Sequence, residues 1–162
     1  MKVMIQAVPA TLEEFSALPQ NDLSKPENTC AMFLLALALY LKDGDAGVAA
    51  VNTLRGPRPL SNYDIQFLRD RLRGKSYLPL AYFDGAEPSN NYLPNTPLTL
   101  EVIADSRPQD IEEGYIRLFL KTAGADSPRP VKLRQKGGLW YLWEYSSILS
   151  GIRLPSAEDA WA

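Results

Sequence analysis

The sequence predicts an α+β fold, in which an N-terminal helical half packs on a C-terminal antiparallel β-meander of about three to five strands. In the first half, apolar residues recur at helical spacing between signals that start and stop helices. In the second half, apolar and polar residues alternate with a period of two, which is typical of half-buried strands. The chain has 162 residues, a length at which one hydrophobic core is usual. We therefore expect a single domain over 1–162.

The first two helices begin with the spacing of a capping box, a hydroxyl residue followed three positions later by Glu. Thr11 and Glu14 have this spacing before a short helix, and Ser24 and Glu27 have it before a helix over 24–43. The central apolar run of the longer helix predicts a buried core helix. That run has about twelve residues, whereas a membrane-spanning helix needs roughly twenty, so no membrane segment is expected.

Two further helices are expected before residue 75. One covers 46–54 and stops at Gly56 and the proline after it. The other begins at Ser61, has Asp64 at its third position, and carries apolar residues at i, i+3 and i+7 that would pack inward. Gly74 ends this helix, because glycine adopts the left-handed conformation that closes many helices.

Strands are expected from about residue 97 onward. Alternating runs occupy 98–103, 115–121 and 131–134, and a further apolar and aromatic run occupies 139–145. Gly137-Gly138 separates the last two runs, and such a pair supplies the positive φ angles of a tight hairpin turn. The runs therefore follow one another as an antiparallel meander.

Composition excludes several kinds of chemistry. The chain contains no histidine and one cysteine, and its net charge at pH 7 is -2. Zinc sites need several nitrogen or sulfur ligands, and a serine or cysteine nucleophile usually needs a histidine base. We therefore expect no metal, no cofactor and no catalytic triad. Cys30 lies in the apolar helix and is expected to be a core residue, and a lone cysteine favours a cytoplasmic location.

Carboxylate chemistry is the alternative that composition leaves open, because folding can bring acidic side chains together. Glu112 with Glu113, or Asp126 with Glu144, are the pairs that would supply it. No spacing selects one pair over the other. Adjacent acidic residues before a glycine are more typical of a solvated turn.

The outward face of the expected sheet is one candidate binding surface. Basic residues would interleave there with aromatic residues, a pattern that binds single-stranded nucleic acid or other anions. The cations are Arg117, Lys121, Lys132 and Arg134, and the aromatic residues are Tyr115 and Phe119. The alternative is a solvated face whose long basic side chains prevent edge pairing. Because the chain is acidic overall, there is no strong nucleic-acid signal.

The segment 77–97 is a second candidate surface, since irregular segments longer than about a dozen residues are often functional. A short strand over 78–83 is expected within it. The residues that would bind a peptide or small ligand by stacking and amide hydrogen bonds are Tyr82, Phe83, Asn90, Asn91 and Tyr92. In this interpretation the tyrosines line a concavity. In the alternative, tyrosines and prolines dock the segment on the core.

A turn that contains two prolines adds two candidate residues. Asp126 is placed to form an Asx turn with its own backbone. Arg129 either pairs with a carboxylate or presents its guanidinium to an anionic partner. Together with Arg134, these residues complete the set of candidate binding positions.

Several motifs connect the chain with a family. They are QFLRDRL at 66–72, YFDGAEPSNNY at 82–92, GADSPRP at 124–130, LR at 133–134, WYLWEYSSILSGIR at 140–153 and DAWA at 159–162. In these motifs the chain resembles a bacterial domain family of unknown function, found mainly in gut-associated Gram-positive bacteria. The last motif departs from the Asp-Pro-Trp expected there. The resemblance implies one complete domain, and it implies no activity, catalytic residue or cofactor.

The sequence therefore favours a non-enzymatic binding or interaction module that contacts a protein or a small ligand. A carboxylate-dependent enzyme without metal is the second hypothesis. The third is a protein that binds single-stranded nucleic acid or another anion on the outer face of its sheet.

Overall fold

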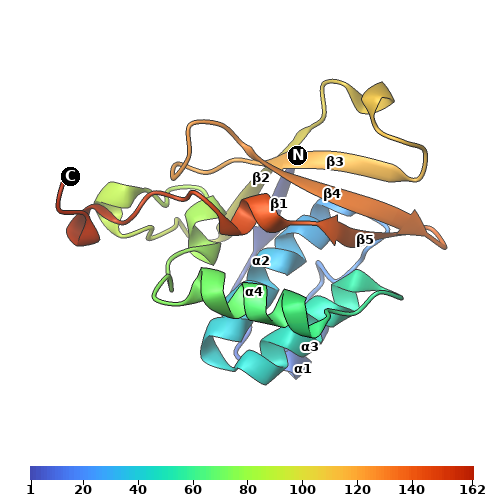
Figure 1. Cartoon of the computed structure of the whole chain (residues 1–162), viewed down its shortest axis with the longest axis horizontal. Coiled ribbons are helices and arrows are strands. Elements are labelled where there is room, and N and C mark those ends of the chain that lie inside the picture. Colours follow the sequence, from blue (N-terminus) through green and yellow to red (C-terminus); the bar gives the residue numbers. More distant parts are fainter.

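The computed structural model describes all of residues 1–162, and its helices precede most of its sheet (Figure 1). The helices are α1 (Leu12–Ser16), α2 (Pro26–Lys42), α3 (Gly44–Arg55) and α4 (Asn62–Leu72). The strands are β1 (Lys2–Ile5), β2 (Leu98–Ala104), β3 (Tyr115–Leu120), β4 (Arg129–Lys136) and β5 (Leu139–Glu144). The expected α+β class is confirmed, and the sheet has five strands.

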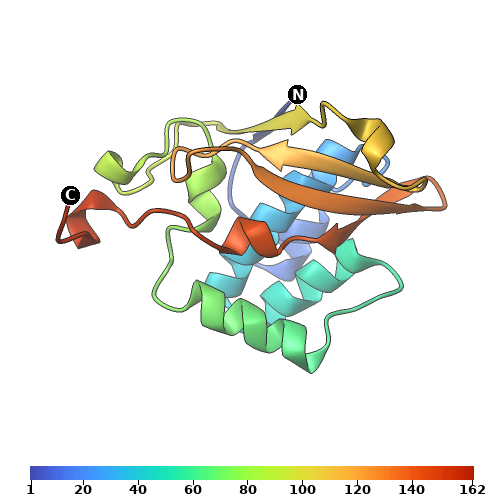
Figure 2. The same cartoon turned by 45° about the horizontal axis from the view of Figure 1, so that its top comes forward.

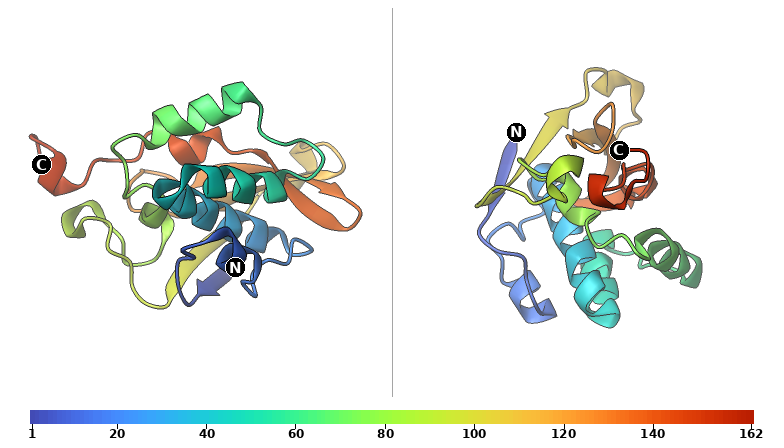
Figure 3. Two further views of the ribbon diagram at one scale, coloured as in Figure 1. Left: turned by 90° about the horizontal axis from the view of Figure 1, so that it is seen from below. Right: turned by 90° about the vertical axis from the view of Figure 1, so that its left-hand side faces the viewer.

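All strands pair antiparallel with their neighbours in the order β1-β2-β3-β4-β5. The sequence pattern predicts β2 to β5 but misses β1, which forms one edge of the sheet (Figure 3, right). In β1 the side chains of Val3 and Ile5 are buried and those of Lys2 and Met4 are exposed. The strand has only 4 residues, and the exposed apolar side chain of Met4 hides the alternation.

Helix α2 lies between the sheet and the other helices (Figures 1 and 2). Its residues are buried without a break from Thr29 to Leu37, because the sheet covers one side and α3 the other. Helix α3 approaches it closely at Gly47, where an added Cβ would lie 2.2 Å from the Cα of Tyr40. None of the helices combines the length and apolar character that crossing a bilayer requires.

The predicted helix starts are correct in one case and wrong in another. At α4, the Ser61 hydroxyl accepts from the Asp64 backbone N–H, and the Asp64 carboxylate accepts from that of Ser61. At α2, the capping box predicted for Ser24 and Glu27 does not form. The Ser24 hydroxyl instead donates to Asp22 at 2.6 Å, and α2 begins at a proline, whose missing N–H needs no cap.

The short strand predicted over 78–83 is also wrong. Residues Pro79–Tyr82 form a 3-10 helix, and only Phe83 makes a single bridge to Leu100 of β2. The segment 77–97 is folded over the core by its own buried side chains, among them Tyr77, Tyr82 and Tyr92.

Candidate functional site

Strand register places the basic and aromatic residues of β3 and β4 on the outer face of the sheet. Tyr115 lies opposite Arg134, and Arg117 lies opposite Lys132. Val131, between the two basic residues of β4, is fully buried on the helix-facing side. The expected interleaving of cations and aromatic rings is therefore present.

Three of the four cations proposed for this face are neutralised by carboxylates. The ion pairs are Arg117–Asp105 at 3.1 Å, Lys121–Glu101 at 3.4 Å and Lys132–Glu112 at 3.4 Å. Arg134 has no carboxylate partner, and its Cζ lies 5.2 Å from the centroid of the Tyr115 ring. The outer face is thus not a surface of four free cations, and its unpaired charge is confined to the side of Arg134.

Next to Arg134, the ring of Trp143 in β5 is contacted by two guanidinium groups. The Cζ atoms of Arg134 and Arg58 each lie 4.8 Å from the centroid of this ring. The two Cζ atoms are therefore within about 10 Å of each other, which is the Debye length at 0.1 M salt. Arg58 belongs to the loop between α3 and α4, which lies below β5 in Figures 1 and 2.

A groove of about 400 Å³ opens between this loop and the β4–β5 hairpin. We call it the cationic groove, and its charged and aromatic lining residues are Arg55, Arg58, Arg134, Lys136, Tyr141 and Trp143. No carboxylate lines it, and none of its four cations takes part in an ion pair. The groove is therefore a concentrated positive site in a chain whose net charge is -2.

Arg55, the last residue of α3, is the most buried cation of the cationic groove, with 7% of its surface exposed. Its Nε donates to the Arg58 carbonyl at 3.1 Å and its Nη1 to the Trp143 carbonyl at 3.0 Å, while Nη2 has no protein acceptor. These bonds cover part of the free edge of β5. A buried charge without an ion-pair partner is costly, so an anion in the groove would stabilise the charge of Arg55.

A second hollow of about 420 Å³ adjoins the cationic groove and shares Arg55, Arg58 and Trp143 with it. Its lining includes the acidic residues Asp64 and Glu144. The shared residues therefore separate the cationic groove, which has only positive charges in its lining, from the second hollow, where both signs of charge are present. An anion is favoured only in the cationic groove.

The aromatic residues predicted to bind ligand in 77–97 lie in the core. Tyr82 is 1% exposed and Tyr92 is 0% exposed, and Phe83 is buried as well. The Tyr82 hydroxyl donates to the Ile148 carbonyl and the Tyr92 hydroxyl to the Arg153 carbonyl, both at 2.6 Å. Tyr82 and Phe83 border a hollow of about 360 Å³, whereas Tyr92 lines none of the main hollows. The expectation that both tyrosines line a concavity therefore fails for Tyr92, and the buried ring of Tyr82 presents almost no surface to its hollow.

The two asparagines of this segment shape its backbone. The Asn90 amide oxygen accepts from the backbone N–H groups of Glu87 and Leu93, and its Nδ2 donates to the Gly85 carbonyl. Asn91 is exposed and takes a left-handed conformation with φ 59°, which asparagine tolerates better than most residues. Asn90 is thus occupied by the turn, and Asn91 closes it.

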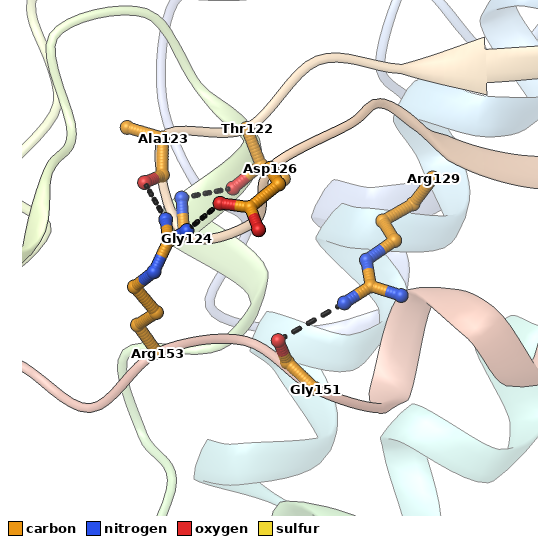
Figure 4. Close-up of polar contacts among 7 residues, drawn as sticks. All are labelled: Thr122, Ala123, Gly124, Asp126, Arg129, Gly151 and Arg153. Atoms are coloured by element: carbon orange, nitrogen blue, oxygen red, sulfur yellow. Dashed lines mark hydrogen bonds and ion pairs between the residues drawn. The ribbon is translucent and has the colours of Figure 1, made fainter.

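Asp126, in the loop before β4, and Arg129, the first residue of β4, help to fasten the C-terminal segment to this part of the chain (Figure 4). Arg153 forms an ion pair with Asp126 and donates to the Ala123 carbonyl, and Arg129 donates to the Gly151 carbonyl at 3.0 Å. Arg129 therefore bonds to a backbone carbonyl, and no carboxylate pairs with it. Both side chains lie apart from the cationic groove.

Of the residues predicted from the sequence, only Arg134 lies in the cationic groove. Sequence reasoning missed Arg55, Arg58, Lys136 and Trp143. Their spacing along the chain carries no motif, because the loop after α3 and the β4–β5 hairpin meet only in the folded domain. The one available signal was an aromatic strand next to a basic one.

The remaining chemistry of the chain offers no second centre. No three acidic, cysteine or histidine side chains lie close enough to hold a metal ion. Glu112 pairs with Lys132, and Asp126 and Glu144 line separate hollows. Burial raises the pKa of the Cys30 thiol to about 12, so this side chain is a poor nucleophile at neutral pH.

Comparison with known families adds one result. A family described as a domain of unknown function (DUF6935) matches residues 7–156, which include all four α-helices and the whole groove. The chain belongs to this family. No curated protein and no solved structure matches it. Membership of the DUF6935 family therefore assigns no activity to the groove.

Proposed function

We propose that this DUF6935 domain is a non-enzymatic binding module whose cationic groove takes an anionic ligand. One observation carries the proposal: Arg55, Arg58, Arg134 and Lys136 line a single groove, and none of them has a carboxylate partner. The outer sheet face next to the groove is built differently, since each of its other three cations is paired.

Electrostatics supports an anion as the occupant. Like charges within about one Debye length repel each other, and the repulsion is screened less where a charge is buried. Arg55 is buried, and Arg58 and Arg134 flank one indole ring. An anion that enters the groove relieves this repulsion and supplies a counter-charge inside the groove, whose own lining contains no carboxylate.

Titration calorimetry with pyrophosphate, citrate and a short oligothymidylate tests the proposal. The double variant Arg134→Ala/Lys136→Ala removes two groove cations. The matched control Lys42→Ala removes an exposed cation that forms no ion pair at the end of α2. At least one anion should bind saturably, more weakly as salt increases, and lose affinity in the double variant only. If none binds, or if the double variant binds as well as the wild type, the proposal is wrong.

The two other hypotheses have less support. Single-stranded nucleic acid needs free aromatic faces on which bases stack, and Trp143 is contacted by two guanidinium groups instead. A carboxylate-dependent enzyme needs acidic residues free to react, and Glu112 and Asp126 each pair with a cation. A bacterial origin and a cytoplasmic location belong to the proposal as well, supported by the family resemblance and by the lone cysteine.

A further inference from the structure

The aromatic rings of the cationic groove, Tyr141 and Trp143, are partly covered by neighbouring groups. Besides its two guanidinium neighbours, Trp143 meets Tyr115 edge-on, with ring centroids 5.6 Å apart. The ring of Tyr141 is covered by Gly56, where an added Cβ would lie 2.8 Å from the Tyr141 Cδ1 atom. Gly56 also has φ 62°. A larger residue is therefore disfavoured there both by the contact with Tyr141 and by the backbone conformation. Because these rings are partly covered, the directional contacts that the groove offers to a ligand are its N–H donors.

These donors are suited to an oxyanion rather than to a neutral molecule. Each guanidinium of Arg55, Arg58 and Arg134 offers N–H groups and no acceptor. A guanidinium fork matches two oxygens of a phosphate, whereas a lysine such as Lys136 acts as a point charge. Because Nε and Nη1 of Arg55 are held by backbone carbonyls, its free Nη2 is fixed before a ligand arrives.

Charge and volume together select the ligand. A phosphate monoester carries about -1.5 to -2 charges near neutral pH, so two phosphate groups balance the four groove cations. A carboxylate carries a single charge and would need more ligand volume for the same effect. The groove volume of about 400 Å³ falls within the range of small-molecule sites, roughly 300 to 1,000 Å³.

We propose that the cationic groove binds a small soluble molecule that carries two phosphate groups, held by the guanidinium groups of Arg55, Arg58 and Arg134. This inference rests on the proposed function and names the ligand class of the same groove. The phosphates lie at the Arg134 side, where no carboxylate competes, and the second hollow with Asp64 and Glu144 stays outside the phosphate site.

Titration calorimetry with pyrophosphate as the probe tests the inference. Wild-type protein should bind pyrophosphate at one site, and Arg134→Ala should weaken binding roughly 10- to 100-fold, the effect of losing hydrogen bonds to a charged group. Arg134→Lys keeps the positive charge but loses the fork, so it should also weaken binding. Lys42→Ala should leave it unchanged. Thermal melts of each variant establish that the domain is folded.

Competing ligands separate the possible failures. If citrate binds at the cationic groove at least as tightly as pyrophosphate, the phosphate inference is wrong while the proposed function stands. If oligothymidylate or vesicles of phosphatidylcholine and phosphatidic acid bind more tightly than pyrophosphate, the ligand is a polymer or a membrane and the inference is wrong. Equal affinities of wild type and Arg134→Lys would overturn the role of the fork. If no anion binds, both proposals fall.

Discussion

Replacing Tyr82 tests most directly whether the segment 77–97 is packed or binds a ligand. The sequence admits a ligand-binding tyrosine, which Tyr82→Ala would remove without harm to the fold. In the structure the side chain is 1% exposed, and its hydroxyl donates to the Ile148 carbonyl at 2.6 Å. Tyr82→Ala should therefore lower the stability of the domain.

The size of the effect follows from what the side chain buries. Losing a buried aromatic ring costs about 3 to 5 kcal/mol, a large part of a total stability that is typically about 5 to 15 kcal/mol. For a chain of this length, that loss lowers the melting temperature by about 6 to 20 °C. Tyr82→Phe removes only the hydroxyl, leaves the Ile148 carbonyl without its donor, and should cost about 1 to 3 kcal/mol.

Urea unfolding and thermal melts of wild type, Tyr82→Phe and Tyr82→Ala measure both quantities. The order of stability should be wild type, then Phe, then Ala. Pyrophosphate binding at the cationic groove should be the same in wild type and Tyr82→Phe, because Tyr82 does not line the groove. A Tyr82→Ala protein that melts within about 2 °C of wild type would refute the packing role, since that shift corresponds to less than about 1 kcal/mol.

Three further outcomes are expected. Gly47→Ala should destabilise the domain by about 1 to 3 kcal/mol in urea unfolding, because the added Cβ would collide with the Tyr40 backbone; an unchanged midpoint would contradict that close approach. Burial raises the pKa of the Cys30 thiol to about 12, so between roughly pH 9 and 12 the thiol keeps its proton in the native state and loses it in the unfolded state. The free energy of unfolding should therefore fall by up to about 1.4 kcal/mol per pH unit over this range. Cys30→Ala should remove this part of the pH dependence. If wild type and variant lose stability with the same slope in this pH range, Cys30 is not its cause. Arg129→Ala should lower stability by about 1 kcal/mol in thermal melts, since it breaks the bond to the Gly151 carbonyl, and a melting curve equal to wild type would show that the bond contributes nothing.

The parts of the fold that could be predicted are those fixed by short-range chemistry. Ser61 and Asp64 form their capping box because both partners lie within one helical turn. Gly137 and Gly138 take φ 58° and 79°, the turn conformation that the hairpin needs. In each case the residues that make the contact are neighbours in the chain, so the pattern contains the whole interaction.

At Ser24 the error has a local cause, since Asp22, two residues earlier, accepts from the hydroxyl that was expected to cap α2. The other errors arise where a distant partner decides the conformation. β1 is a strand because β2 pairs with it, and the ammonium group of Met1 donates to the Val102 carbonyl at 2.8 Å. Tyr92 keeps a positive φ of 55° while its ring stacks on Tyr77, with centroids 5.3 Å apart. Nothing near these residues in sequence reveals the partner, so propensity and alternation gave the wrong interpretation.

The cationic groove is the strongest case of this kind. In the sequence, Arg55 is an ordinary basic residue at the end of a helix, and Trp143 is one of several aromatic residues in a strand. What makes the groove distinctive is that no carboxylate stands among its own lining residues, and that property depends on which surfaces meet after folding. Arg55 joins those surfaces, because it bonds both the Arg58 carbonyl and the Trp143 carbonyl. The same side chain therefore fixes the two walls and lines the space between them, so the width of the groove is set by the fold before any anion binds.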